Sequence, residues 1–160
     1  MKTIIIGLGN PILGDDGVGW RVVEELQSNI EYRDSNIEFD YVSLGGLSLM
    51  ERMVGYDRAI LVDSMETGRI PVGSVWEIPL EALPNPSAGH SASAHDASLL
   101  TALETGRSMG LPLPHEVKVV AVEAAQVYDF SEELSPAVAA AIPMAVQAVL
   151  DILALEKEPV

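Results

Sequence analysis

Three side chains of this sequence could together hold a metal ion. Asp16 lies in a glycine-rich loop at residues 7–19, Asp63 closes an apolar run at residues 58–64, and His95 precedes an amphipathic stretch. Two carboxylates and one imidazole give an O,O,N donor set, which suits a divalent transition metal. The chain contains no cysteine, which excludes a thiolate nucleophile and a cysteine-ligated metal.

The loop at residues 7–19 joins a predicted strand to a predicted helix. Residues 3–6 form an unbroken apolar, β-branched run, typical of a strand buried on both faces. Val18, Val22 and Leu26 then recur at four-residue spacing, which predicts an amphipathic helix. In open α/β sheets, ligands bind beyond the carboxyl ends of the strands. The loop therefore lies where a binding site is expected.

Two other interpretations of this loop are possible. Gly7 and Gly9 open like the dinucleotide-binding motif G-x-G-x-x-G, but position 12 is isoleucine, and Asp15 and Asp16 would repel a pyrophosphate. Alternatively, one aspartate caps the following helix, which contributes about 1 kcal/mol. Because capping needs one carboxylate, we assign the structural role to Asp15. We expect Asp15→Asn to cost about 1 kcal/mol or less and to retain activity.

Asp63 ends a second apolar strand, at residues 58–64. If this strand lies beside the first one, Asp63 and Asp16 reach the same edge of the sheet, and a buried carboxylate there needs a partner. The structural alternative is an aspartate that bonds only the N–H groups of its own loop.

His95 falls in the first turn of a helix predicted to start near Ser93. The helix dipole disfavours the imidazolium there, which keeps the ring neutral and able to bind a divalent metal. The alternative is an exposed histidine without a role. His90 and His115 are assigned none.

The remaining pattern predicts a three-layer α/β/α sandwich with a mostly parallel sheet of about five strands. Three further strands are expected, at residues 36–42, 73–79 and 117–122. The strand at 73–79 should run antiparallel, since the connection that precedes it leaves little room for a crossover helix. Residues 80–94 are expected to form a mobile surface loop, and residues 156–160 a flexible tail.

Two more helices complete this prediction. One covers residues 47–54, and the last begins with Ser135 as N-cap and Pro136 at its first position. Five apolar residues of the last helix are expected to face the sheet: Ala139, Ile142, Val146, Val149 and Leu153.

Composition limits the partners and the location. The 160 residues fit a single domain, and the net charge of −15 with a pI near 4.3 excludes nucleic acid as a partner and favours cations or a basic segment. No apolar run reaches the roughly 18 residues needed to cross a bilayer, and no signal peptide is visible. We therefore expect a soluble, cytoplasmic monomer that does not insert into membranes.

Taken together, these motifs resemble the nickel-iron hydrogenase maturation proteases, over nearly the whole chain. The resemblance consists of a Gly-x-Gly-Asn opening at residues 7–10, an acidic pair before Gly17-x-Gly19, the strand ending in Asp63, and Ser-Ala-His at 93–95. Two departures stand out. Many relatives have Asp-x-Gly-Thr-x-Gly where this chain has residues 44–49, which concerns substrate choice, and a proline often stands at the position of Ala94.

The resemblance implies an endopeptidase that removes the C-terminal extension of a hydrogenase large-subunit precursor once nickel is in place. It also implies that Asp16, Asp63 and His95 contact this nickel, and the family fold agrees with the predicted sandwich. We expect the nickel to arrive with the substrate rather than to be stably bound by the free enzyme. The three residues would then fix one peptide bond for attack by a water that the metal or a carboxylate activates.

Two rival functions remain open. A receiver-type phospho-acceptor module also has an acidic pair after its first strand and an aspartate that ends its third, with magnesium between them. Its lysine belongs near the end of the last strand, whereas Lys118 sits near the start of that strand. A nickel-binding chaperone without catalytic activity, on the same fold, is the second rival.

Overall fold

The computed structural model describes residues 1–29, 34–43, 45–80, 94–125 and 129–155, and the side chains of residues 94–98 are not part of that description. Within these ranges one sheet has the strand order β2-β1-β3-β5-β4. Its strands are β1 (Thr3–Leu8), β2 (Ile37–Val42), β3 (Arg58–Met65), β4 (Val75–Pro79) and β5 (Glu116–Glu123). The pairs β1·β2, β1·β3 and β3·β5 are parallel and β4·β5 is antiparallel, as predicted.

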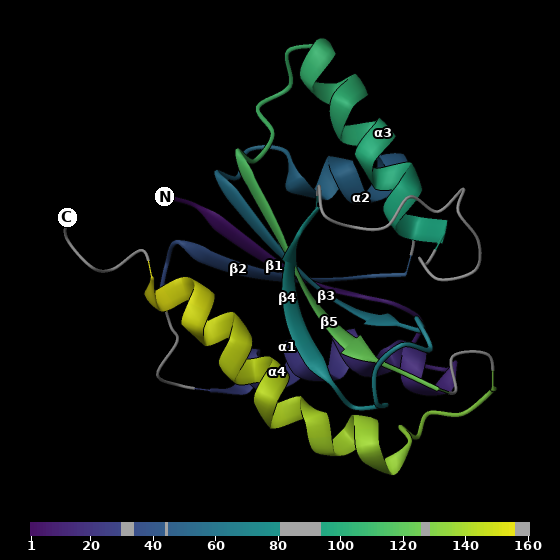
Figure 1. Ribbon diagram of the computed structural model, residues 1–160. Coiled ribbons are helices and arrows are strands. Elements are labelled where there is room, and N and C mark those ends of the chain that lie inside the picture. The colour runs from purple at the N-terminus through teal and green to yellow at the C-terminus, as the bar shows by residue number, and fades with distance from the viewer. Residues whose placement is uncertain (30–33, 44, 81–93, 126–128, 156–160) are drawn as a thin grey trace.

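Helices cover both faces of the sheet (Figure 1). They are the short 3-10 helix η1 (Gly14–Gly17), α1 (Val18–Ser28), α2 (Gly46–Met53), α3 (Ala94–Ser108) and α4 (Pro136–Ala154). One buried cluster joins α2 and α3 to the sheet, and a second joins α1 and α4 to its opposite face. The predicted α/β/α sandwich is confirmed.

The alternation of side chains along β3 determines which face of the sheet Asp63 and Ser64 are directed toward. Ala59, Leu61 and Met65 belong to the cluster under α2 and α3, whereas Ile60 and Val62 belong to the cluster under α1 and α4. Because successive side chains of a strand point to opposite faces, Asp63 is directed toward the α2 and α3 layer. Ser64 is directed toward the layer of α1 and α4.

The inward stripe of α4 differs from the predicted one. Its buried residues are Val138, Ala141, Ala145, Val149, Ile152 and Leu153. Ala139, which was expected to face the sheet, is exposed, and Ile142 and Val146 are only half-buried. An alanine-rich helix offers small apolar side chains on every side, so spacing alone places its stripe poorly.

The same helix also corrects an expectation about membranes. With 19 residues and a mean hydropathy of 2.0, α4 is long and apolar enough to cross a bilayer, so the statement that no segment reaches this limit was wrong. A core helix can meet the same criterion. Here α4 packs against β4, β5 and α1. The predicted loop, apart from Leu80 and Ala94, and the predicted tail lie outside the described residues.

Candidate functional site

Glycines bring the first loop against the sheet. A Cβ on Gly19 would lie 2.2 Å from the carbonyl oxygen of Val62, and one on Gly9 would lie 1.9 Å from the backbone oxygen of Asp16. Gly9 also has a φ of 128°, which side-chain-bearing residues rarely adopt. The glycines therefore serve close packing of η1 and α1 on β1 and β3. This packing brings Asp16 to the carboxyl end of β3.

Asp16 is half-buried, and both of its carboxylate oxygens accept hydrogen bonds. Oδ2 accepts from the backbone N–H of Asn10 at 2.8 Å, and Oδ1 accepts from the hydroxyl of Ser64 at 3.2 Å. These bonds orient the carboxylate. Because each oxygen carries two lone pairs, Asp16 can still contact a cation.

Asp63 is 1% exposed and accepts a hydrogen bond from the N–H of Ser64 at 2.8 Å. Ser64 thus contacts both carboxylates, Asp63 through its amide and Asp16 through its hydroxyl. The prediction that β1 and β3 are neighbours, with Asp16 at the end of β3, is confirmed. The structural role considered for Asp63, a bond to an adjacent N–H, also exists. Accepting this hydrogen bond and contacting a metal are compatible roles for Asp63, because the Ser64 amide uses a single lone pair of the carboxylate.

The linking residue Ser64 was missed by sequence reasoning. Its signal was a second polar side chain directly after Asp63 at the end of a strand that is otherwise apolar. Ser64 is 4% exposed, and its hydroxyl donates to Asp16, so the side chain has a partner that its own strand does not supply.

His95 is the second residue of α3, and its side chain is not among those described. Figure 1 shows that α3 begins on the side of the molecule where β3 and β5 end. Moreover, α3 covers the face toward which Asp63 is directed. Among the side chains that the structure does describe, no group of three His, Cys, Asp or Glu could hold a metal. A complete O,O,N set thus depends on His95 and stays a prediction.

Asp15 has a different role from its neighbour. It is fully buried, and it accepts hydrogen bonds from the N–H of Ser135 at 2.6 Å, the hydroxyl of Ser135 at 2.8 Å and the N–H of Ala125 at 3.3 Å. Neither η1 nor α1 has a side-chain cap, so the prediction of a carboxylate capping α1 is wrong. Asp15 instead joins the exit of β5 to the residue that precedes α4.

We therefore expect Asp15→Asn to destabilise the protein by roughly 2–3 kcal/mol, more than a lost helix cap would, because bonds to a buried carboxylate are charge-assisted. The side-chain NH2 group of the new asparagine would also point at a backbone N–H of Ser135 or Ala125, and two donors cannot form a hydrogen bond. Activity should persist below the melting temperature. Urea unfolding and an activity assay test this, with exposed Asp151→Asn on α4 as the matched control. An inactive Asp15→Asn protein of unchanged stability would contradict the structural role.

Glu123 is a second buried carboxylate at this edge, at the end of β5. It is 1% exposed, and its Oε1 accepts from the N–H of Thr67 at 2.8 Å, the hydroxyl of Thr67 at 2.8 Å and the N–H of Gly68 at 2.9 Å. No local sequence pattern marks this residue. Its bonds hold the turn after β3, which supports the strand end that carries Asp63.

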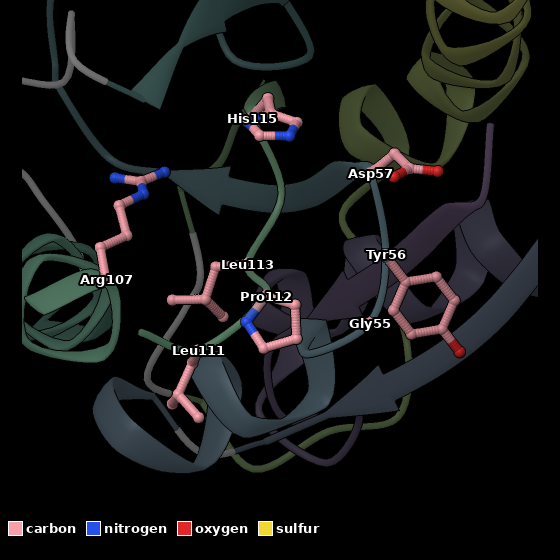
Figure 2. A pocket seen from close by; sticks show the side chains of 8 residues that line it. All are labelled: Gly55, Tyr56, Asp57, Arg107, Leu111, Pro112, Leu113 and His115. Atoms are coloured by element: carbon pink, nitrogen blue, oxygen red, sulfur yellow. The ribbon is translucent and has the colours of Figure 1, made fainter. Parts of the chain in front are cut away.

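A cavity of about 500 Å³ lies at the other end of the strands, beside the amino ends of β3 and β5 (Figure 2). It is lined by the residues before β3 and β5, together with one residue of α3: Gly55, Tyr56, Asp57, Arg107, Leu111, Pro112, Leu113 and His115. A hydrogen bond from the Tyr56 hydroxyl to Glu38 raises the pKa of Tyr56 to about 12. The cavity is separate from the candidate site, because these residues precede β3 and β5, whereas Asp63 lies near the carboxyl end of β3 and Asp16 bonds Ser64 there.

Lys118 argues against the receiver interpretation. It is the third residue of β5, and its ammonium group pairs with Glu77 at 3.2 Å and Glu116 at 3.4 Å. A lysine at the amino end of β5 cannot contact a group held at the carboxyl end of β3, because the strands run parallel.

The chain is similar to known proteins over most of its length. A family model described as hydrogenase maturation protease matches residues 20–152. The hydrogenase expression/formation protein HupD of Thiocapsa roseopersicina is 24% identical over 96% of this chain and 68% of its own length. A putative hydrogenase maturation protease of Methanocaldococcus jannaschii is 29% identical, over 92% of this chain and 93% of its own.

Two solved structures extend the comparison to the fold. The hydrogenase maturating endopeptidase HybD from E. coli superimposes with a TM-score of 0.83 at 25% identity, covering 98% of this chain and 94% of that one. A maturation protease HybD from Thermococcus kodakarensis gives a TM-score of 0.71 at 21% identity, covering 95% and 99%. The arrangement of strands and helices is therefore shared along nearly the full chain.

Proposed function

The chain belongs to the hydrogenase maturation protease family and is thus a peptidase, and we propose that it removes the C-terminal extension of a nickel-iron hydrogenase large-subunit precursor after nickel insertion. The observation that carries this proposal is the Ser64 link. It fixes two carboxylates, Asp16 and Asp63, at the edge of the sheet where α/β proteins bind their ligands.

In this proposal Asp16, Asp63 and His95 contact the nickel that the precursor carries. Carboxylate and imidazole ligands suit a divalent transition metal. The cysteine-free chain has no thiolate of its own, so cysteine thiolates of the precursor supply the softer ligands. The nickel belongs to the substrate, and the enzyme completes its coordination in the complex.

Contact with the nickel positions the precursor so that one peptide bond lies near the carboxylates. A water then attacks the carbonyl carbon of that bond, and one carboxylate accepts a proton from the water. The carbon–nitrogen bond breaks, and the new amine leaves with a proton. Positioning supplies a large part of the rate enhancement in such a scheme, because the reacting groups no longer have to meet by diffusion.

The acidic surface also bears on the partner and the location. A net charge of −15 favours a basic segment of the precursor and disfavours nucleic acid. The cytoplasmic location and the monomeric state stay predictions from the sequence. Size-exclusion chromatography with light scattering would measure the oligomeric state directly.

Incubation with a purified, nickel-loaded large-subunit precursor tests the proposed function. We expect release of one C-terminal peptide, detected by mass spectrometry, and no release when the protein is omitted. Nickel transfer without peptide release would point instead to a chaperone on the same fold. Phosphorylation by acetyl phosphate would revive the receiver interpretation.

A further inference from the structure

Two large apolar side chains are exposed beside the loop that carries Asp16. Phe130 is 87% exposed and Ile12 is 48% exposed. Backbone hydrogen bonds hold the two segments together: the N–H of Ser131 donates to Ile12 at 3.0 Å, and the N–H of Gly14 donates to Ser131 at 2.7 Å. The backbone segments that carry Ile12 and Phe130 therefore lie side by side on the surface.

The exposure of Phe130 does not come from a loose backbone. The next residue, Ser131, forms a β-bridge with Leu13. The guanidinium group of Arg21 donates a hydrogen bond to the carbonyl oxygen of Glu132 at 2.9 Å. Ser135 then bonds to Asp15. Exposed apolar side chains that lie together, and not singly, are typical of a surface that a partner covers.

The charge around this apolar pair limits the partner. Asp129, Glu132 and Glu133 are exposed and flank Phe130 in the sequence. In the described part of the chain, no lysine or arginine forms an ion pair with any of the three. An apolar centre with an anionic border is complementary to a peptide segment that carries an apolar side chain flanked by lysine or arginine.

We propose that Phe130 and Ile12, with the carboxylates of Asp129, Glu132 and Glu133, form a docking surface for a basic, apolar segment of the polypeptide substrate. This inference rests on the proposed function and adds a surface that selects the substrate. Docking there positions the precursor beside Asp16, which lies in the 3-10 turn directly after the Ile12 segment. Phe130 contributes to substrate binding and not to bond cleavage.

Steady-state kinetics of Phe130→Ala test the apolar part of this surface. We expect KM for the precursor to rise about tenfold while kcat changes less than about twofold, because an aromatic anchor contributes to binding before the reaction. Phe130→Leu should recover part of the affinity. Met109→Ala is the matched control, since Met109 is 72% exposed and follows α3 at the opposite end of the sheet. Equal KM values for Phe130→Ala and the control would overturn the docking surface.

The charged border is tested by the triple variant Asp129→Asn, Glu132→Gln, Glu133→Gln. Its KM should exceed that of the wild type at low salt, and the difference should shrink as salt rises. Binding of the immobilised precursor is measured in parallel by surface plasmon resonance. If the wild type binds without cleaving and Phe130→Ala binds more weakly, the docking surface stands and the proposed function fails. A border variant with wild-type KM at every salt concentration would overturn the electrostatic part.

Discussion

Asp16→Ala, Asp63→Ala and His95→Ala are each expected to lower the rate of nickel-dependent processing by at least about 100-fold, since residues that only orient the ligands of a metal already contribute 10–100-fold and proton transfer adds more. Asp16 and Asp63 lie at one edge of the sheet, where Ser64 contacts both. In the proposed mechanism, loss of either carboxylate removes a contact to the nickel and a candidate proton acceptor. Loss of His95 removes the nitrogen ligand of the proposed set.

The two carboxylates need isosteric variants as well, because they are also structural acceptors. Asp63 is 1% exposed, and alanine there removes the carboxylate that accepts the hydrogen bond of the Ser64 amide, at a cost of about 1–3 kcal/mol. Asp16→Asn and Asp63→Asn keep the size of the side chain and most of the packing. Circular dichroism and urea unfolding identify the variants that stay folded, and only these are assayed.

Matched controls come from the opposite edge of the sheet. Asp57→Ala and His115→Ala change an aspartate and a histidine that line the cavity before β3 and β5, and both residues are exposed. Processing should stay within about twofold of the wild type, as for surface changes remote from a site. A folded variant of Asp16, Asp63 or His95 that cleaves as fast as these controls would remove that residue from the site.

The part of the fold that the sequence predicted correctly depends on local patterns. Residues 4–6 and 59–62 are apolar throughout, which identified the central strands β1 and β3. The alternation of apolar and polar residues at 36–42 identified β2 as a strand near the edge of the sheet. The short connection after β3 identified β4 as antiparallel. Because β1 and β3 are parallel neighbours, the loop that follows β1 and carries Asp16 lies beside the carboxyl end of β3.

What the sequence could not predict depends on distant partners. Asp15 bonds Ser135, which lies 120 positions away, so no local pattern could show that its carboxylate serves the start of α4 and not that of α1. Glu123 bonds Thr67 from 56 positions away. Such bonds appear only after the strands have been assembled, which is why both buried carboxylates had to be read from the structure.

A second large effect concerns the metal in the precursor. Both oxygens of Asp16 already accept hydrogen bonds, and one oxygen of Asp63 accepts another. With His95, the proposed site offers three ligands, whereas a closed structural site usually has four. We therefore expect the free enzyme to bind nickel weakly, and the contact to become strong only when the precursor supplies the remaining ligands. The metal then acts as a checkpoint for cleavage.

It follows that a precursor without nickel should stay uncut, with a cleavage rate at least about 100-fold below that of the loaded precursor, because in the proposed mechanism the metal contact positions the peptide bond. The two forms are mixed separately with excess enzyme, and the released C-terminal peptide is quantified by mass. Adding free nickel to the enzyme alone should not rescue cleavage, whereas reloading the precursor should. Circular dichroism of both precursor forms shows whether the nickel-free form is folded, and a rate that falls only because it is unfolded would be recognised in this way. Equal cleavage of two folded forms would overturn the checkpoint and leave a peptidase that recognises its substrate through polypeptide contacts alone.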